Sequence, residues 1–198
     1  AMDLEDVEDI VRRNPDVVVI VDEAYVDFGA ESALPLVEKY ENLLVVQTFS
    51  KSRSMAGMRI GYAVGSPKLI RYLEDVKYSF NSYTMSRLAL ECGTEAVKDR
   101  AYFEETVSRI VQTRGSAKKI LRDMGFLCTD SMANFLFVTH PEHRAEELFL
   151  ALKDAGIFVR YFSSPRIDNY LRITVGTDAQ MEALYRFLER YLNRGKSV

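Results

Sequence analysis

The feature that most constrains the fold is an uninterrupted run of β-branched residues near the start of the chain, residues 17–21 (VVVIV). Apolar and polar residues do not alternate in this run, which is typical of a strand buried on both faces of a parallel sheet. Polar residues follow directly, among them Asp22 and Tyr25. Because ligands bind outside the carboxyl ends of strands in open α/β sheets, we expect Asp22 and Tyr25 at a site.

A polar loop at residues 48–59 lies between two further apolar runs, residues 43–46 and residues 60–64. The loop contains a single lysine, Lys51. Its neighbours with hydroxyl or guanidinium groups include Thr48, Ser50, Ser52, Arg53 and Arg59. An amine beside hydroxyls and fixed positive charge suits a ligand that carries both a carbonyl group and a phosphate.

The rest of the chain predicts long helices and then a smaller mixed region. Residues 84–98 and 100–124 have the apolar spacing of amphipathic helices. After Gly125, short strands and helices are expected to alternate. We therefore predict an α/β fold, with a mostly parallel sheet and flanking helices at residues 3–115 and a small α+β subdomain at residues 116–198.

The composition excludes several classes of protein. The chain has 26 basic and 29 acidic residues and a formal net charge of -3, so it lacks the basic excess of a nucleic-acid-binding protein. No apolar stretch is long enough to span a bilayer, and the N-terminus is acidic where a signal peptide would be basic. We expect a soluble cytoplasmic protein without nucleic-acid or membrane partners.

The sequence favours no metal site. Cys92 and Cys128 are isolated from each other, so we expect two reduced thiols in packing positions and no disulfide or zinc site. His140 and His143 could ligate a metal, but no further histidine and no neighbouring cysteine accompanies them. A solvated loop is the favoured interpretation of both histidines.

Three candidate site residues each have an ordinary interpretation beside the chemical one. Asp22 can hold a pyridine ring nitrogen protonated, or it can cap the next helix, and its position does not decide between them. Tyr25 can donate a hydrogen bond to a phenolate, or it can be a half-buried aromatic residue. Lys51 can supply a Schiff-base amine, act as the base for a serine nucleophile, or be a solvated surface charge.

Two arginines in the C-terminal region are candidates for binding anions. Arg172 lies between Leu171 and Ile173, so alternation along a strand places it on the opposite face. In a cleft, Arg172 could bind a substrate carboxylate with two hydrogen bonds; the alternative is an exposed strand face. Arg160 is a similar but weaker candidate.

Three motifs in this order resemble those of the fold type I pyridoxal-phosphate aminotransferases. They are Asp22-Glu23-Ala24-Tyr25, Thr48-Phe49-Ser50-Lys51-Ser52 and Ala56-Gly57-Met58-Arg59-Ile60-Gly61-Tyr62. The chain is most similar to the histidinol-phosphate aminotransferase branch, which also has a Val-Arg pair like Val159-Arg160 and a segment like residues 171–177. Family members are considerably longer, and this chain resembles their C-terminal part only.

The resemblance implies a role for each candidate residue. Lys51 would form the internal aldimine with pyridoxal 5'-phosphate and shuttle a proton between cofactor and substrate. Asp22 would keep the pyridine nitrogen protonated, and Tyr25 would bond the phenolic oxygen. The side chains that would bind the cofactor phosphate are those of Thr48, Ser50 and Arg59. Arg172 would bind the substrate carboxylate. Arg160 would bind the same carboxylate or a substrate phosphate.

The resemblance also implies an activity and a partner. The expected reaction moves an amino group between an amino acid or amino-alcohol phosphate and 2-oxoglutarate, in a protein expected to be a homodimer. Two alternatives stay open. The chain could be a catalytically silent cofactor-binding or oligomerising fragment, or it could decarboxylate a phosphorylated amino acid with the same cofactor.

Overall fold

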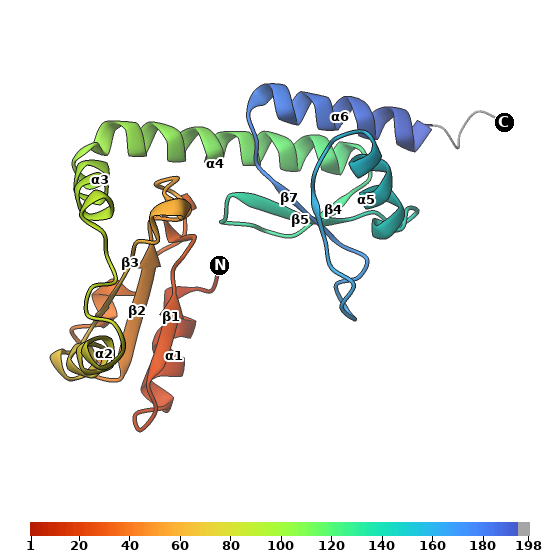
Figure 1. The fold of residues 1–198 in the computed structure, drawn as a ribbon. Helices are drawn as coiled ribbons and strands as arrows, with labels where there is room; N and C mark the ends of the chain where they lie inside the picture. The colour runs from red at the N-terminus through yellow and green to blue at the C-terminus, as the bar shows by residue number, and fades with distance from the viewer. Residues whose placement is uncertain (194–198) are drawn as a thin grey trace. The chain divides into compact units, whose positions relative to one another are not determined.

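The computed structural model describes residues 1–193, which form two compact units (Figure 1). The first unit comprises residues 1–107 and the second begins at residue 108. The division falls within the long helix α4 (Arg100–Asp123), in which the domain boundary predicted at residues 115 and 116 also lies. We describe each unit separately.

The first unit contains a three-stranded sheet in the order β1-β2-β3. Its strands and main helices are α1 (Leu4–Arg13), β1 (Val19–Asp22), β2 (Leu43–Thr48), β3 (Gly61–Gly65), α2 (Pro67–Phe80) and α3 (Arg87–Lys98). β1 and β2 are parallel, whereas β2 and β3 are antiparallel, with Thr48 opposite Gly61. The predicted α/β class is confirmed, and the sheet is mixed.

The prediction that residues 17–21 are buried on both faces of the sheet is wrong. Val19 and Val21 pack into a cluster with Val7 and Val11 of α1, whereas Ile20 is 61% exposed. The difference arises because, among the described residues, the cluster covers only the face that Val19 and Val21 share. The β-branched residues therefore predicted the strand correctly, but the prediction that both of its faces are covered was wrong.

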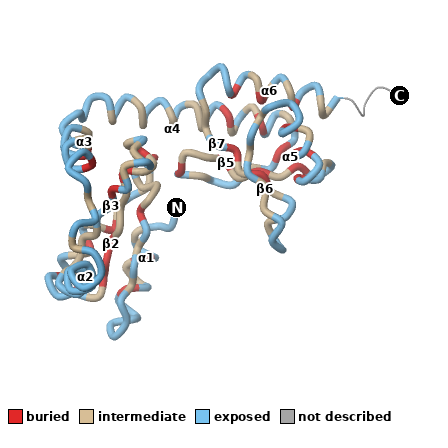
Figure 2. The backbone as a smooth tube through the Cα atoms, in the orientation of Figure 1, coloured by how far each residue is buried: buried red, intermediate tan, exposed pale blue. Residues whose placement is uncertain are grey.

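The second unit contains a four-stranded antiparallel sheet in the order β4-β5-β7-β6. Its elements, besides the last part of α4, are β4 (Leu127–Cys128), β5 (Phe135–Thr139), α5 (Ala145–Asp154), β6 (Arg160–Tyr161), β7 (Leu171–Thr174) and α6 (Asp178–Asn193). This arrangement matches the α+β character predicted for the region. Figure 2 shows buried residues on α4, α5, β5 and β7 of this unit.

One side chain of the second unit differs from expectation. His140 is buried, with its ring centroid 4.9 Å from that of Phe126 and 4.7 Å from that of His143, so the prediction of a solvated loop is wrong for His140. Its Nδ1 accepts a hydrogen bond from the backbone N–H of Glu142 at 3.1 Å. This bond gives the buried ring a structural role in the turn before α5. Both cysteines are free thiols, as predicted.

Candidate functional site

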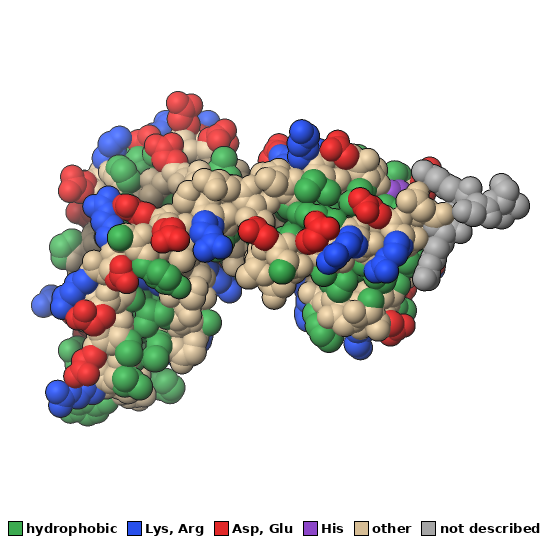
Figure 3. All heavy atoms as spheres, turned by 90° about the horizontal axis from the view of Figure 1, so that it is seen from above, with side chains coloured by type: hydrophobic (Ala, Val, Ile, Leu, Met, Phe, Trp, Pro, Cys, Tyr) green, Lys and Arg blue, Asp and Glu red, His purple; other side chains and the backbone are tan. Residues whose placement is uncertain are grey.

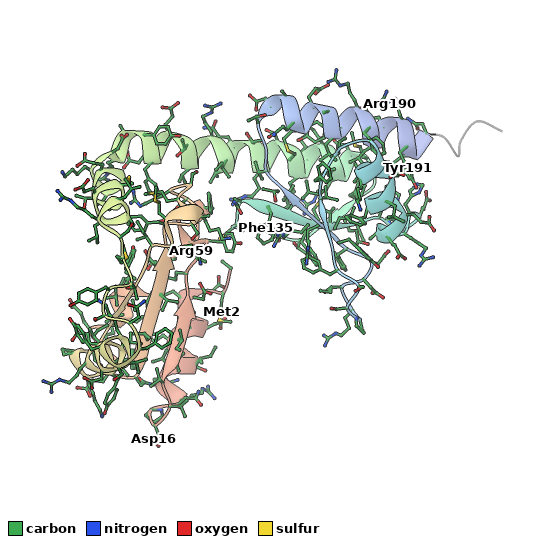
Figure 4. All side chains as sticks on the ribbon, viewed as in Figure 1. Met2, Asp16, Arg59, Phe135, Arg190 and Tyr191 are labelled. Carbon is green, nitrogen blue, oxygen red and sulfur yellow. The ribbon has the colours of Figure 1, made fainter. Side chains whose placement is uncertain are left out.

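The candidate site of the first unit lies at the carboxyl ends of β1 and β2, where the sequence places its polar motifs. Because the two strands are parallel, their last residues, Asp22 and Thr48, lie at the same edge of the sheet. Figure 4 shows Arg59 beside this end of β2, whereas Asp16 lies at the opposite end, ahead of β1. The Asp22 side chain is exposed and its Oδ1 accepts a hydrogen bond from the backbone N–H of Ala24 at 3.0 Å. Asp22 therefore shapes the turn that leads to Tyr25.

Glu23 fixes the segment that carries Tyr25, and the sequence did not single it out. This side chain is only 8% exposed, and its carboxylate accepts hydrogen bonds from the Ala33 N–H at 2.5 Å and the Ser32 hydroxyl at 2.7 Å. Gln47 Nε2 on β2 donates a third, at 2.7 Å. A buried carboxylate needs such donors. The sequence signal that could have identified Glu23 is its position directly after Asp22, at the end of an apolar strand.

Lys51 and Tyr25 are brought together by the two loops. The Lys51 side chain is half-buried, with Nζ 5.4 Å from the centroid of the Tyr25 ring. The neighbouring Ser52 is buried, and its hydroxyl donates a hydrogen bond to Oδ2 of Asp27. A cationic amine over an aromatic face is a favourable arrangement. The interpretation of Lys51 as a fully solvated surface charge therefore does not describe this structure.

Thr48 and Ser50 form a compact hydroxyl pair at the start of the loop. Their Oγ atoms are 3.0 Å apart, and the Ser50 backbone N–H donates to Thr48 Oγ1 at 3.1 Å. Thr48 Oγ1 also lies within hydrogen-bonding distance, 3.2 Å, of the Ile60 carbonyl, which joins the two ends of the loop. Two adjacent hydroxyls are suitable donors for an anionic oxygen.

Arg59 closes the loop in a left-handed backbone conformation, with φ of 57°. Its Nη1 donates to the Ala56 carbonyl at 2.9 Å, and its side chain is exposed. A Cβ on Gly61 would lie 3.1 Å from the Gln47 carbonyl oxygen, so a glycine suits the close approach of β3 to β2 there. These contacts place the Arg59 guanidinium on the loop that holds Lys51.

Arg53 has a different role from the one expected for it, which was to provide positive charge beside Lys51. Its guanidinium carbon lies 4.2 Å from the Phe103 ring centroid and 5.3 Å from that of Phe49. Its Nη1 donates to the Ala96 carbonyl of α3 at 2.5 Å. Arg53 thus ties the loop to α3 and α4 within the first unit.

Tyr62 adds a phenol on β3, the strand that follows the loop. Its hydroxyl donates to Gln47 Oε1, and its ring meets Phe49 edge-on with centroids 6.1 Å apart. Burial, followed by the negative charge of Asp27, raises the pKa of Tyr62 above its ordinary value. The phenol is therefore neutral at physiological pH, and it extends the Glu23–Gln47 hydrogen-bond network across the sheet.

Arg160 and Arg172 lie opposite each other on β6 and β7 of the second unit. Both guanidinium groups approach the ring of Phe162, with their central carbons 5.5 Å and 6.0 Å from its centroid. Leu171 and Ile173 are buried while Arg172 faces the other way, as alternation predicts. The buried Nε of Arg172 makes no hydrogen bond to the described residues.

The donor set of the first unit fits a phosphorylated carbonyl compound with an aromatic ring. One loop carries the Lys51 amine, a pair of hydroxyls and a guanidinium, and the other segment carries a carboxylate and a phenol. All of these groups lie at one edge of one sheet. Within residues 1–193, no group of three or more metal-ligating side chains occurs, and no helix is long and apolar enough to cross a bilayer.

Comparisons with known proteins agree with this chemistry. The family model for "Aminotransferase class I and II" matches residues 1–188. A histidinol-phosphate aminotransferase of Brachyspira hyodysenteriae is 53% identical over 180 residues, which are 90% of this chain and 51% of that protein. One from Lactococcus lactis subsp. lactis is 49% identical over 198 residues, all of this chain and 55% of that protein. The chain thus spans about half the length of these curated relatives.

A solved structure extends the likeness to three dimensions. The histidinol-phosphate aminotransferase of Sinorhizobium meliloti, in complex with pyridoxal-5'-phosphate, superimposes with a TM-score of 0.85 at 24% identity. The match covers 98% of this chain and 54% of that one. At this identity the likeness establishes a shared fold.

Proposed function

Because the chain belongs to the class I and II aminotransferase family, we propose that its first unit binds pyridoxal 5'-phosphate at Lys51. The observation that carries the proposal is the half-buried Lys51 amine, 5.4 Å from the Tyr25 ring centroid, on a loop that begins with the Thr48–Ser50 hydroxyl pair. When bound, this cofactor supplies a protonated pyridine ring that withdraws electrons from the substrate. The proposed reaction is transfer of an amino group to or from 2-oxoglutarate.

Each residue of the site has a proposed task in that reaction. Lys51 Nζ holds the cofactor and moves the proton at the substrate carbon. The Asp22 carboxylate keeps the ring nitrogen protonated, and the Tyr25 hydroxyl orients the ring oxygen. The cofactor phosphate is bound by Thr48, Ser50 and Arg59, and the anionic groups of the substrate by Arg160 and Arg172.

Binding of the cofactor tests the proposal directly. Pyridoxal 5'-phosphate is added to the 198-residue chain, borohydride is added to reduce the linkage, and mass spectrometry locates the modified lysine. We expect modification at Lys51 and its loss in Lys51→Ala. Lys77→Ala is a matched control because Lys77 Nζ also lies over a tyrosine ring, 5.6 Å from the centroid of Tyr78, but on α2. Equal modification of wild type and Lys51→Ala would refute the assignment.

The relatives support an amino-alcohol phosphate as the amino donor, since both are named histidinol-phosphate aminotransferases. The measurement is consumption of 2-oxoglutarate with histidinol phosphate as donor. Release of carbon dioxide without consumption of the keto acid would favour the decarboxylase instead. Cofactor binding at Lys51 without either reaction would favour a catalytically silent binding fragment.

The proposed setting is a cytoplasmic homodimer that binds neither nucleic acid nor membranes. Basic and acidic side chains are interspersed on the face in Figure 3, which supports the absence of a nucleic-acid surface. Exposed apolar side chains such as Val76, Phe80 and Tyr83 support association with a second copy. Sedimentation of the purified chain at several concentrations measures the proposed dimer directly.

A further inference from the structure

A side-chain hydrogen bond joins the segment that carries Tyr25 to the loop that carries Lys51. The hydroxyl of Ser52 donates to Oδ2 of Asp27, 25 residues earlier in the sequence. Ser52 is 5% exposed, whereas Asp27 is an exposed residue. The bond therefore spans two loops whose neighbouring residues, Tyr25 and Lys51, are in contact.

Asp27 stands on a rigid support. It is the middle residue of a short 3-10 helix, Val26–Phe28, and Phe28 is fully buried. Gly29 follows with φ of 113°, a conformation that ends the helix and that other residues adopt at a cost. The backbone under the Asp27 carboxylate is thus fixed by packing on one side and by a tight turn on the other.

Ser52 is in turn part of a closed turn with Lys51. The Ser54 N–H donates to the Lys51 carbonyl at 3.1 Å, and the Met55 N–H donates to the Phe49 carbonyl at 3.0 Å. These two backbone bonds hold residues 51–54 in one turn. The turn therefore places the Ser52 hydroxyl one residue from the Lys51 backbone, which carries the amine over the Tyr25 ring.

We propose that Asp27 is a positioning residue that holds the Lys51 amine in place by accepting the hydrogen bond of Ser52. This inference rests on the proposed function, because it assigns Asp27 a role in presenting Lys51 to the cofactor. The required property is an oxygen acceptor at the Asp27 position, which an amide oxygen also provides. Asp27→Asn is therefore expected to retain the effect and Asp27→Ala to lose it.

The first test measures the rate at which pyridoxal 5'-phosphate labels Lys51. The aldehyde condenses with Nζ and releases water, and hydride from borohydride then reduces the C=N bond to a stable amine. We expect Asp27→Ala and Ser52→Ala each to slow labelling about five- to tenfold, the worth of one hydrogen bond. The double variant should be no slower than either single variant, because both remove the same bond. Glu31→Ala, which removes an exposed acid from the same segment, should match wild type.

Labelling at the wild-type rate in Asp27→Ala, an equal loss in Asp27→Asn, or multiplied effects in the double variant would each overturn the proposal. An equal loss in Asp27→Asn would point to the charge of Asp27 and not to its acceptor. A wild-type chain that is not labelled at Lys51 would instead overturn the proposed function.

A second measurement needs no cofactor. It tests whether Asp27 holds the turn even if the wild-type chain is not labelled at Lys51. The Ser54 amide is protected by its bond to the Lys51 carbonyl, so its hydrogen exchange reports whether the turn is held. We expect faster exchange at Ser54 in Asp27→Ala and Ser52→Ala, and wild-type exchange in Asp27→Asn. Unchanged exchange in Asp27→Ala would show that Asp27 does not hold the turn.

Discussion

The second unit is organised around one apolar core, whereas the first divides its buried apolar residues among small clusters and leaves others exposed. Side chains from α4, α5, α6, β5 and β7 meet in the core of the second unit. In the first unit, one cluster lies between α1 and the sheet and another surrounds Phe49 and Ile60. Phe80, at the end of α2, is 90% exposed.

The difference indicates two ways of holding a side chain of a candidate site in place. Arg172 is positioned by packing, because Leu171 and Ile173 on either side are buried in the core of the second unit. Lys51 is positioned by polar contacts, because Glu23 and Asp27 tie the segment around Tyr25 to β2 and to the Lys51 loop. Apolar substitutions should therefore affect the second unit most, and polar substitutions should affect the site of the first.

The largest effects are expected from truncations in the core of the second unit, such as Leu152→Ala on α5. Leu152 is fully buried in the core of the second unit, so its truncation should lower the free energy of unfolding of that unit by about 2–5 kcal/mol. Chemical denaturation, followed by hydrogen exchange of the α5 amides, measures this loss. Leu150→Ala on the same helix is the control, because Leu150 is largely exposed and should change stability by less than about 0.5 kcal/mol. Similar losses in both variants would contradict the single-core description.

A smaller loss is expected from Glu23→Ala in the first unit. The substitution leaves the Ala33 N–H and the Gln47 amide without their buried acceptor, at a cost of about 2–3 kcal/mol in unfolding free energy. Hydrogen exchange of β2 measures the change. Glu38→Ala, which removes an exposed acid, is the matched control. A loss below about 0.5 kcal/mol would mean that packing, and not Glu23, holds the segment around Tyr25.

The location of the candidate site in the fold could be predicted because strand ends are visible in the sequence. The run at residues 17–21 indicated β1, and parallel pairing places Asp22 and Thr48 at one edge. The bonds that hold the segment around Tyr25 could not be predicted, since Glu23–Gln47 and Asp27–Ser52 join residues 24 and 25 apart. Such pairings depend on how the segments fold back and leave no local pattern.

Short strand length and long-range contacts account for other features that the sequence did not indicate. β4 has only two residues, too few for an alternation to be recognised. The burial of His140 depends on its contact with Phe126, and the exposure of Ile20 depends on which face α1 covers. Local sequence specifies the element, and its surroundings specify what is buried.

A third prediction concerns alkaline pH and the second unit. Burial, reinforced by the charges of Glu182 and Asp178, raises the pKa of Tyr185 above its ordinary value of 10.0. The folded state therefore holds the phenol proton more tightly than the unfolded state does. This stabilisation is complete below pH 10 and is lost as pH rises through the raised pKa. Denaturation at several pH values should show that Tyr185→Phe loses less unfolding free energy at alkaline pH than wild type does. The difference between the two proteins should be smaller than the effect of Glu23→Ala. Parallel pH profiles would contradict it.

The smallest effect on stability is expected from Phe80→Ala. Phe80 is 90% exposed in the first unit, so in the monomeric chain its truncation should change the free energy of unfolding by less than about 0.5 kcal/mol. Phe126→Ala provides the contrast, because Phe126 is buried in the second unit and should lose about 3–5 kcal/mol. Denaturation at two protein concentrations sharpens the comparison. A Phe80→Ala loss that grows with concentration would mean that a second copy covers this surface in solution, since only association makes stability depend on concentration.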